Sequence, residues 1–327
     1  MAYNFEIVSL ARAKLAQQKL EREEQLRVRL LDAYRQTPRL QQIDMELQKN
    51  MAYALQEAFT QGSDPVAVME QARQKNQVLQ QERDALAAQV YPAGWLDESP
   101  ICSRCGGSGY IGSTMCICLE SLCRQEQQKK LEAMNLGDHH FGSFRLDYYP
   151  TQYNASLGFS PRSIMEKTLN HCREFAAAFT QGAGNLLFVG GTGLGKTFLA
   201  TAVAKAVSAQ GCSVSYEGAI SLFSKLERAR FSPGEDSRRE VEDLTNADLL
   251  IIDDLGTELP GAFVTSSLYG LLEERLRLGK SMIVTTNLTY DELAKRYTPR
   301  VASRLYGDFA LLSFVGSDIR MLRSQNP

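Results

Sequence analysis

No hydrophobic run in this chain approaches the roughly 18 to 20 residues that a membrane-spanning helix needs. The first residues, Met-Ala-Tyr-Asn-Phe-Glu, also lack the cationic segment, apolar segment and cleavage site of a secretory signal. An excess of one charge is missing too, because 36 Lys and Arg face 38 Asp and Glu. We therefore expect a cytoplasmic protein without a membrane partner, in which any nucleic-acid contact is a local patch.

What the chain does contain is typical of globular proteins. Of its 327 residues, 44% are hydrophobic and 23% are charged, which argues against a collagen-like, disulfide-scaffold or wholly disordered chain. At roughly 150 residues per domain, this length predicts about two domains.

Cysteine is distributed unevenly. The stretch from Cys102 to Cys123 holds five of the seven cysteines. In a reducing compartment, grouped thiols indicate metal ligands rather than disulfides. Four thiolates suit a structural Zn²⁺ and leave no open position for a catalytic water. The predicted zinc ligands are Cys102, Cys105, Cys116 and Cys118.

Other arrangements of this stretch remain open at this point. Cys123, His139 or His140 could replace one of the four ligands. The alternative to a metal site is a set of thiols in a glycine-rich loop. The two isolated cysteines, Cys172 and Cys212, carry no motif.

Residues 4–90 contain little glycine and much Gln, Glu, Leu, Arg and Ala, which are good helix formers. Breaks at Thr37-Pro38 and at Gly62–Pro65 predict three long helices. In the second, apolar residues recur every three or four positions, which predicts packing as a hairpin or short coiled coil. These residues are Leu40, Ile43, Leu47, Met51, Ala54 and Ala58. The mixed charges favour a docking surface, whose partner the composition does not name.

A phosphate-binding loop follows a probable helix and an apolar strand. The segment Gly190–Thr197 fits G-x-x-x-x-G-K-[ST] and precedes an Ala-rich helix. Backbone N–H groups of such a loop and the positive end of the helix bind phosphates, Lys196 reaches the β- and γ-phosphates, and the Thr197 hydroxyl coordinates Mg²⁺. The predicted ATP-binding residues are Gly190, Gly191, Thr192, Gly193, Leu194, Gly195, Lys196, Thr197 and Asp253.

Two further strands end in polar residues. The apolar run Leu249–Leu255 includes Asp253, a predicted Mg²⁺ ligand, and Asp254, which is placed to polarise the attacking water. The run 281–286 is followed by Asn287, which can reach the γ-phosphate or the water at the same sheet edge. An acidic turn and a simple helix cap are the competing interpretations.

These motifs, with Arg300–Gly307 and Phe314–Arg320, resemble over about residues 140 to 323 the AAA+ ATPases of the DnaC/DnaI helicase-loader group and the related IstB transposition ATPases. The resemblance implies an α/β fold with a parallel sheet. It also agrees with the end at Pro327, too early for a C-terminal helical lid. The expected divisions are a helical arm, a zinc element, a linker with an adenine-pocket segment, and the ATPase domain, at 1–95, 96–125, 126–157 and 158–327.

The same resemblance implies roles for single residues. Asn287 would be the sensor-1 residue, Arg304 an arginine finger that enters a neighbouring subunit, and Arg320 the sensor-2 arginine, while Phe144–Tyr149 would form part of the adenine pocket. An arginine supplied in trans would couple hydrolysis to self-association. From the residues alone, either arginine could instead form a surface ion pair. Many AAA+ members have Glu where Asp254 stands, which leaves its role as base open.

Cations also cluster between the second strand and the Asp253 strand. In the resembled family this segment touches single-stranded DNA, which implies contacts from Lys225, Arg228 and Arg230 and stacking by Phe231. The alternative is a solvated helix face, balanced by acidic neighbours. Those neighbours are Glu235, Asp236 and Glu240.

The helical arm and the cysteine stretch are similar to the helicase-docking region of DnaI-type loaders, whereas IstB-type proteins usually carry a shorter extension without zinc. The resemblance therefore implies an ATPase, with ATP, Mg²⁺ and Zn²⁺, that loads the hexameric replicative helicase onto single-stranded DNA. The alternatives are an IstB-type transposition ATPase and a nucleotide-gated adaptor without hydrolysis.

Overall fold

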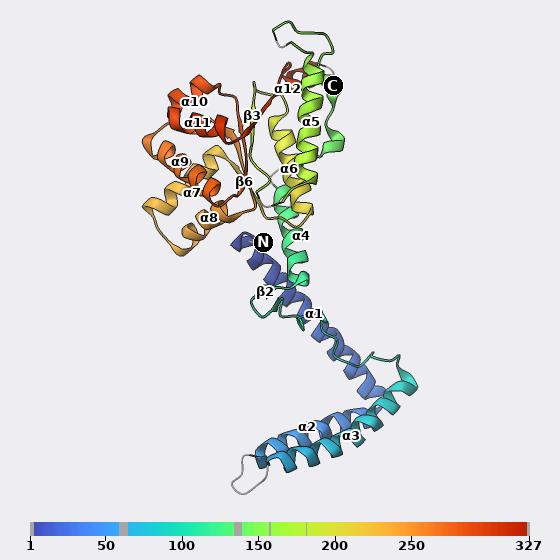
Figure 1. Ribbon diagram of the computed structural model, residues 1–327. Coiled ribbons are helices and arrows are strands. Elements are labelled where there is room, and N and C mark those ends of the chain that lie inside the picture. The colour runs from blue at the N-terminus through green and yellow to red at the C-terminus, as the bar shows by residue number, and fades with distance from the viewer. Residues whose placement is uncertain (1–2, 59–64, 134–138, 157, 181, 326–327) are drawn as a thin grey trace. The chain divides into compact units, whose positions relative to one another are not determined.

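The computed structural model describes residues 3–58, 65–133, 139–156, 158–180 and 182–325 (Figure 1). The chain forms two compact units. One contains Met1–Arg12 and Ile117–Pro327, and the other contains Ala13–Cys116. The division expected from the sequence, at 1–95, 96–125, 126–157 and 158–327, stays a prediction.

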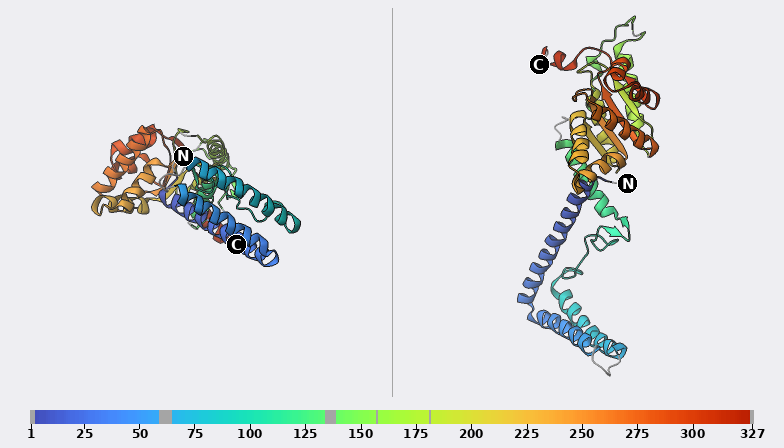
Figure 2. Two further views of the ribbon diagram at one scale, coloured as in Figure 1. Left: turned by 90° about the horizontal axis from the view of Figure 1, so that it is seen from below. Right: turned by 90° about the vertical axis from the view of Figure 1, so that its left-hand side faces the viewer.

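Three long helices dominate the first part of the chain, as the composition predicts. They are α1 (Phe5–Gln36), α2 (Pro38–Ala58) and α3 (Pro65–Val90). The first break falls at Thr37 as expected, and Gly62, Ser63 and Asp64 of the second lie outside the described residues. Helices α2 and α3 lie side by side, which confirms the predicted hairpin (Figure 2).

The hairpin is held together by charge pairs and by a short apolar seam. Arg39 pairs with Glu82 and Arg83 with Asp44, each at 2.8 Å. Of the predicted apolar stripe, Leu40, Ile43 and Ala54 are buried, and Leu47 and Ala58 are partly buried. Met51 is 47% exposed, so part of the stripe faces outward.

A small antiparallel hairpin, β1 (Tyr110–Ile111) and β2 (Thr114–Met115), separates the two cysteine pairs of the zinc stretch. Helix α4 (Ile117–Ala133) follows directly. The turn between Cys102 and Cys116 is therefore a compact local element rather than an extended loop.

The unit that contains Ile117–Pro327 alternates strands with helices. Two single 3₁₀ turns come first, η1 (Phe141–Ser143) and η2 (Leu146–Tyr148). The elements that follow are α5 (Pro161–Ala177), β3 (Leu186–Val189), α6 (Lys196–Ala209), β4 (Val214–Gly218), α7 (Ala219–Phe231), α8 (Glu235–Asn246), β5 (Leu249–Leu255), α9 (Ala262–Arg277), β6 (Ser281–Thr286), α10 (Tyr290–Arg296), α11 (Pro299–Gly307), β7 (Ala310–Ser313) and α12 (Ile319–Gln325). No helix in the described part of the chain has both the length and the apolar composition needed to span a bilayer.

Strands β3 to β7 form one parallel sheet in the order β4-β5-β6-β3-β7. Side chains alternate between its faces, as the period of a strand requires. On β5, Leu249 and Ile251 pack with α5 and α6, whereas Leu250 and Ile252 pack with α7 and α9. Both faces are covered, which explains the continuous apolar runs in the sequence.

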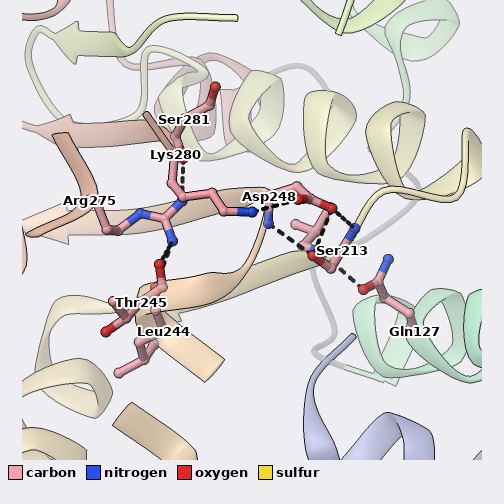
Figure 3. Close-up of polar contacts among 9 residues, drawn as sticks. Gln127, Ser213, Leu244, Thr245, Asp248, Arg275, Lys280 and Ser281 are labelled. Atoms are coloured by element: carbon pink, nitrogen blue, oxygen red, sulfur yellow. Dashed lines mark hydrogen bonds and ion pairs between the residues drawn. The ribbon is translucent and has the colours of Figure 1, made fainter. Parts of the chain in front are cut away.

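A buried polar network lies at the end of the sheet where β5 begins (Figure 3). The carboxylate of Asp248, 2% exposed, accepts hydrogen bonds from Ser213 N and Oγ, both at 3.0 Å. Lys280 Nζ lies 2.9 Å from its other oxygen. Arg275 donates to the carbonyl oxygens of Leu244 and Ser281, at 2.7 and 2.6 Å.

Gln127 of α4 joins this edge through both ends of its amide. Its Oε1 accepts from Val214 N at 3.0 Å, and its Nε2 donates to Ser208 Oγ at 2.7 Å and to Cys212 O at 2.9 Å. A buried amide with three partners is well satisfied. Helix α4 is thereby fixed to the start of β4 and to the end of α6.

Candidate nucleotide site

The loop between β3 and α6 has the shape that its glycines require. Gly195 adopts a φ of 90° at the start of α6, a conformation that favours glycine. Phe314 directly follows β7. A Cβ at Gly190 would lie 2.3 Å from the carbonyl oxygen of Phe314, so only glycine fits there.

Lys196 reaches back over the loop. Its Nζ donates to the carbonyl oxygens of Gly190 and Gly191, at 2.8 and 2.7 Å. Burial lowers the pKa of Lys196, and the nearby Asp254 and Asp253 oppose that shift. In the described part of the chain its hydrogen bonds go to carbonyl groups alone, so the ammonium group is poised for an anion.

The start of α12 contacts the loop from the other side. Ile319 N donates to Gly193 O at 3.0 Å, and a Cβ on Gly193 would lie 1.9 Å from Asp318 Oδ1. The next residue, Arg320, lowers the pKa of both Lys196 and Asp254 through its charge. The structure therefore brings the predicted sensor-2 arginine near the phosphate loop.

Asp253 lies at the end of β5 and points at the first turn of α6. Its Oδ1 accepts from Thr197 Oγ1 at 3.2 Å and from Thr285 Oγ1 at 2.7 Å. Its Oδ2 accepts from Tyr216 OH at 2.9 Å. A hydroxyl and a carboxylate oxygen at this separation are the hard donors that Mg²⁺ takes in nucleotide sites, so the residues fit that ion.

Asp254 occupies a β-bulge. Between Ile252 and Leu255, β5 contains one residue more than β6, which bends the strand and re-aims its side chains. Asp254 has a φ of 54°, an uncommon value for a residue other than glycine. The residue as a whole is exposed, yet partial burial of its carboxylate, together with the charge of Asp253, raises its pKa.

The remaining sensor position is also at this edge. Asn287 follows β6 directly and is exposed, next to the strand that ends in Asp253. The loop after Asp254 is fixed by the buried Glu258, which accepts from Gly256 N at 3.0 Å and from Tyr297 OH at 2.5 Å. Arg296 also forms an ion pair with Glu258, at 3.2 Å.

Three of these positioning groups belong to no motif, and sequence analysis missed them. Tyr216, Thr285 and Glu258 come from different elements and meet only in the fold. Thr285 carried the nearest signal, because it is a polar residue inside an apolar strand two positions before Asn287.

The predicted adenine-pocket segment lies against the phosphate loop. Tyr149 is buried and donates to Leu194 O at 2.9 Å. Phe144 stacks on Tyr149 and meets Phe198 edge-on, with centroid distances of 5.8 and 5.3 Å. Both rings approach Gly195. Aromatic surface is therefore present beside the loop.

Arg304 is engaged elsewhere. It lies on α11, where its guanidinium forms ion pairs with Glu273 at 2.6 Å and Asp308 at 3.2 Å. It lines a surface groove with Tyr269 and Arg300. The structure therefore does not bring Arg304 to the phosphate loop of its own chain.

The three cations predicted to contact DNA differ from one another. Lys225 pairs with Glu217 at 2.6 Å and Arg228 with Glu240 at 3.5 Å, which agrees in part with a charge-balanced helix face. Arg230 instead lies over the rings of Phe231 and Phe263, each at 5.7 Å. Phe231 is 65% exposed.

The four predicted zinc ligands converge. The sulfur atoms of Cys102, Cys105, Cys116 and Cys118 all lie within 4.8 Å of one another, and Cys102 Sγ is 3.8 Å from Cys116 Sγ. Tetrahedral Zn²⁺ with bonds of about 2.3 Å places its sulfurs roughly 3.8 Å apart. Backbone N–H groups of Cys105 and Arg104 lower the pKa of the Cys102 thiol. The cluster fits Zn²⁺.

The alternative ligands lie outside this cluster. Cys123 is fully buried, and burial raises the pKa of its thiol to about 11. His139 packs on the ring of Phe198 at 4.3 Å, and His140 Nδ1 accepts from Gly142 N at 3.1 Å. Among the described residues, the cysteine cluster is thus made of the four predicted thiols.

The parallel sheet, the phosphate loop and the acidic end of β5 define an AAA+ ATP-binding domain of the P-loop class. Residues 145–303 match the family described as IstB-like ATP binding protein. The part of the chain that carries the phosphate loop is thus similar to IstB-like ATP binding proteins.

Curated relatives are similar to part of the chain. The replicative helicase loader DnaC of Escherichia coli strain K12 is 24% identical over 137 residues, which cover 42% of this chain and 56% of the relative. The insertion sequence IS232 putative ATP-binding protein of Bacillus thuringiensis subsp. berliner is 28% identical over 148 residues, which cover 44% and 58%. The chain thus spans little more than half the length of these relatives.

Solved structures are similar to a little more than half of the chain. A crystal structure of the DnaC helicase loader has a TM-score of 0.47 and 23% identity, covering 55% of this chain and 99% of that one. A crystal structure of DnaI has a TM-score of 0.44 and 18% identity, covering 56% and 92%.

Proposed function

We propose that this protein is a cytoplasmic, ATP-hydrolysing loader of the hexameric replicative helicase onto single-stranded DNA. The observation that carries the proposal is the combination of a nucleotide site with a separate helical hairpin and a four-cysteine cluster. The hairpin and the cluster would dock on the helicase, while the AAA+ domain binds ATP and DNA. The DnaC relatives support the same choice.

In this proposal Lys196 holds the phosphates, and Thr197 and Asp253 bind Mg²⁺. Magnesium would neutralise the phosphate oxygens when ATP is bound. Asp254 and Asn287 would orient the attacking water, and Arg320 would stabilise charge on the transferred group.

Assembly would depend on Arg304. In a single chain its guanidinium is paired with Glu273 and Asp308. A neighbouring copy with ATP bound would offer the more negative partner, so Arg304 would exchange these carboxylates for the γ-phosphate. ATP favours the assembled state only because it binds that state better than the separate chains.

The DNA-binding contacts in the proposal are Lys225, Arg228 and Arg230. Arg230 is expected to contribute most, because it is exposed beside two aromatic rings on which a base can stack. Lys225 and Arg228 must first leave their carboxylate partners.

Transposition is the second candidate function. The IS232 relative is similar over the same ATPase region, at 28% identity. An adaptor that binds ATP without turnover would share the nucleotide site. The client protein and the rate of hydrolysis therefore distinguish the three.

The test is capture of partners by the full-length protein. We expect wild-type protein to capture the host's replicative helicase, and Cys102→Ser/Cys105→Ser to lose both bound zinc and the helicase. Cys212→Ser, a cysteine outside the cluster, is the matched control and is expected to retain both. Hydrolysis is measured in parallel with single-stranded DNA and helicase.

Capture of a transposase instead would move the function to transposition. Helicase capture without any stimulated hydrolysis would favour the adaptor. Helicase capture that persists after zinc is lost would contradict the docking role of the cysteine cluster.

A further inference from the structure

Asp253 is held from both neighbouring strands. Strand β5 lies between β4 and β6, and each neighbour contributes one hydroxyl group. Tyr216 of β4 donates to Oδ2 at 2.9 Å, and Thr285 of β6 donates to Oδ1 at 2.7 Å. Because the two bonds reach different oxygens, they fix the rotation of the carboxylate, which is otherwise a broad torsion.

The same hydroxyls reach the elements that would handle ATP. Thr201 Oγ1 lies 3.5 Å from the Tyr216 hydroxyl and donates to Thr197 O at 2.8 Å, one turn earlier in α6. Thr285 Oγ1 also accepts from Asp254 N at 2.9 Å. One set of hydroxyls therefore links Thr197, Asp253 and the bulged Asp254.

Packing alone does not require these hydroxyls. Tyr216 is 6% exposed, and its ring belongs to the core between the sheet and α6. Phenylalanine would fill that space, yet it could not donate to Asp253. Thr285 is fully buried inside a strand whose neighbours Ile283 and Val284 are apolar, and valine would have nearly the same shape.

We propose that Tyr216 and Thr285 are positioning residues that present Asp253 Oδ1 to Thr197, and so set the affinity of the nucleotide site for Mg²⁺. The inference rests on the proposed Mg²⁺-dependent function of the site. Hydrogen-bond partners behind a metal ligand fix its orientation, and their loss typically lowers metal affinity by about 10- to 100-fold. Phosphate binding by the loop and Lys196 does not pass through these hydroxyls.

The experiment measures the affinity of full-length protein for a fluorescent ATP analogue, in EDTA and across a Mg²⁺ titration. For Tyr216→Phe and Thr285→Val we expect unchanged affinity in EDTA, and about a tenfold rise in the Mg²⁺ concentration that gives half the Mg²⁺-dependent gain. Tyr3→Phe is the matched control, because it removes one buried hydroxyl bond, to Gly211 O at 2.8 Å. Thr285→Ser keeps the hydroxyl and is expected to match wild type.

The outcomes separate the two proposals. If wild-type affinity does not depend on Mg²⁺, the proposed metal role of the site fails and this inference fails with it. If wild type responds to Mg²⁺ and both variants respond equally, the inference alone is overturned. Equal losses in EDTA and in Mg²⁺ would also overturn it, because they indicate a structural role. Should Tyr216→Phe unfold, the comparison of Thr285→Val with Thr285→Ser decides.

Discussion

The two ends of strand β5 each place an aspartate near a lysine, with opposite results. At its start, Asp248 is paired with Lys280 at 2.9 Å and receives two bonds from Ser213 (Figure 3). At its end, Asp253 is bonded to hydroxyl groups, while Lys196 is bonded to carbonyl oxygens. Asp248 and Lys280 therefore neutralise each other, whereas Asp253 and Lys196 are each bonded to uncharged groups.

The pKa values follow this difference. Burial raises the pKa of Asp248, but Lys280 and Ser213 outweigh it, so the pKa ends below its usual range. At the other end, burial lowers the pKa of Lys196 and raises that of Asp254. The start of β5 therefore stabilises the fold, whereas the charged groups at its end are available for the polyphosphate and cation of the proposed function.

The largest expected effect is the loss of nucleotide binding in Lys196→Ala. Each charge-assisted hydrogen bond contributes about 1.5 to 3 kcal/mol, so losing those that Lys196 would make to two phosphates weakens binding at least about a hundredfold. Stability is expected to change little, because no carboxylate is left without its partner. Titration with a fluorescent nucleotide and urea unfolding check both parts. Retained affinity would show that this end of β5 is not the phosphate site.

Lys280→Ala is expected to lower the stability of the fold and to leave nucleotide binding unchanged. It removes the ion pair between Lys280 and Asp248, whose residue is only 2% exposed. Removing one partner of a buried pair costs about 3 kcal/mol, so urea unfolding should shift strongly while nucleotide affinity is kept. The double variant Lys280→Met/Asp248→Asn should recover part of the stability, because it also removes the buried carboxylate, while Arg275 stays buried in the same network. If the single variant is as stable as wild type, the contrast between the two ends fails.

The smallest effect concerns Asp254→Asn. Because the pKa of Asp254 is raised above its ordinary value of 3.8, its ionised form opposes folding. That cost is absent below pH 3.8 and complete above the raised pKa, so the variant should be slightly more stable at neutral pH. The gain should stay under about 1 kcal/mol, because the side chain is exposed.

Urea unfolding without nucleotide, followed from pH 3 to 7, tests the sign. Asp248→Asn is the opposite case, since a lowered pKa gives stability that is present above the ordinary value and lost as the pH falls through the lowered one. Two variants that respond to pH in the same direction would refute the comparison. Asp254→Asn should also slow hydrolysis if Asp254 polarises the water.

The same contrast separates what the sequence could predict from what it could not. The phosphate loop, the acidic end of β5 and the cysteine cluster are contiguous patterns, because one turn or one strand end makes each of them. The network around Asp248 joins α4, β4, β5 and β6. No spacing in the sequence indicates that Gln127 accepts a hydrogen bond from Val214, the residue after Ser213. Tyr216 and Thr285 are hidden for the same reason.

The ion pairs of the cations on α7 could not be predicted from the sequence either. The cations of α7 were predicted from their proximity in sequence, yet the carboxylate of Glu217 that engages Lys225 precedes the helix, and that of Glu240 lies on α8. A motif gives the type of each side chain, whereas its partners depend on the fold. The DNA-binding role of these residues stays a prediction.

The contact between Gly193 and Asp318 limits how freely the phosphate loop can evolve. The G-x-x-x-x-G-K-[ST] pattern leaves this position open. Here its φ is 72°, and any side chain would collide with the carboxylate at the start of α12. A side chain at position 193 would therefore meet both a backbone conformation that favours glycine and the carboxylate of Asp318, so this open position of the pattern is expected to tolerate substitution poorly.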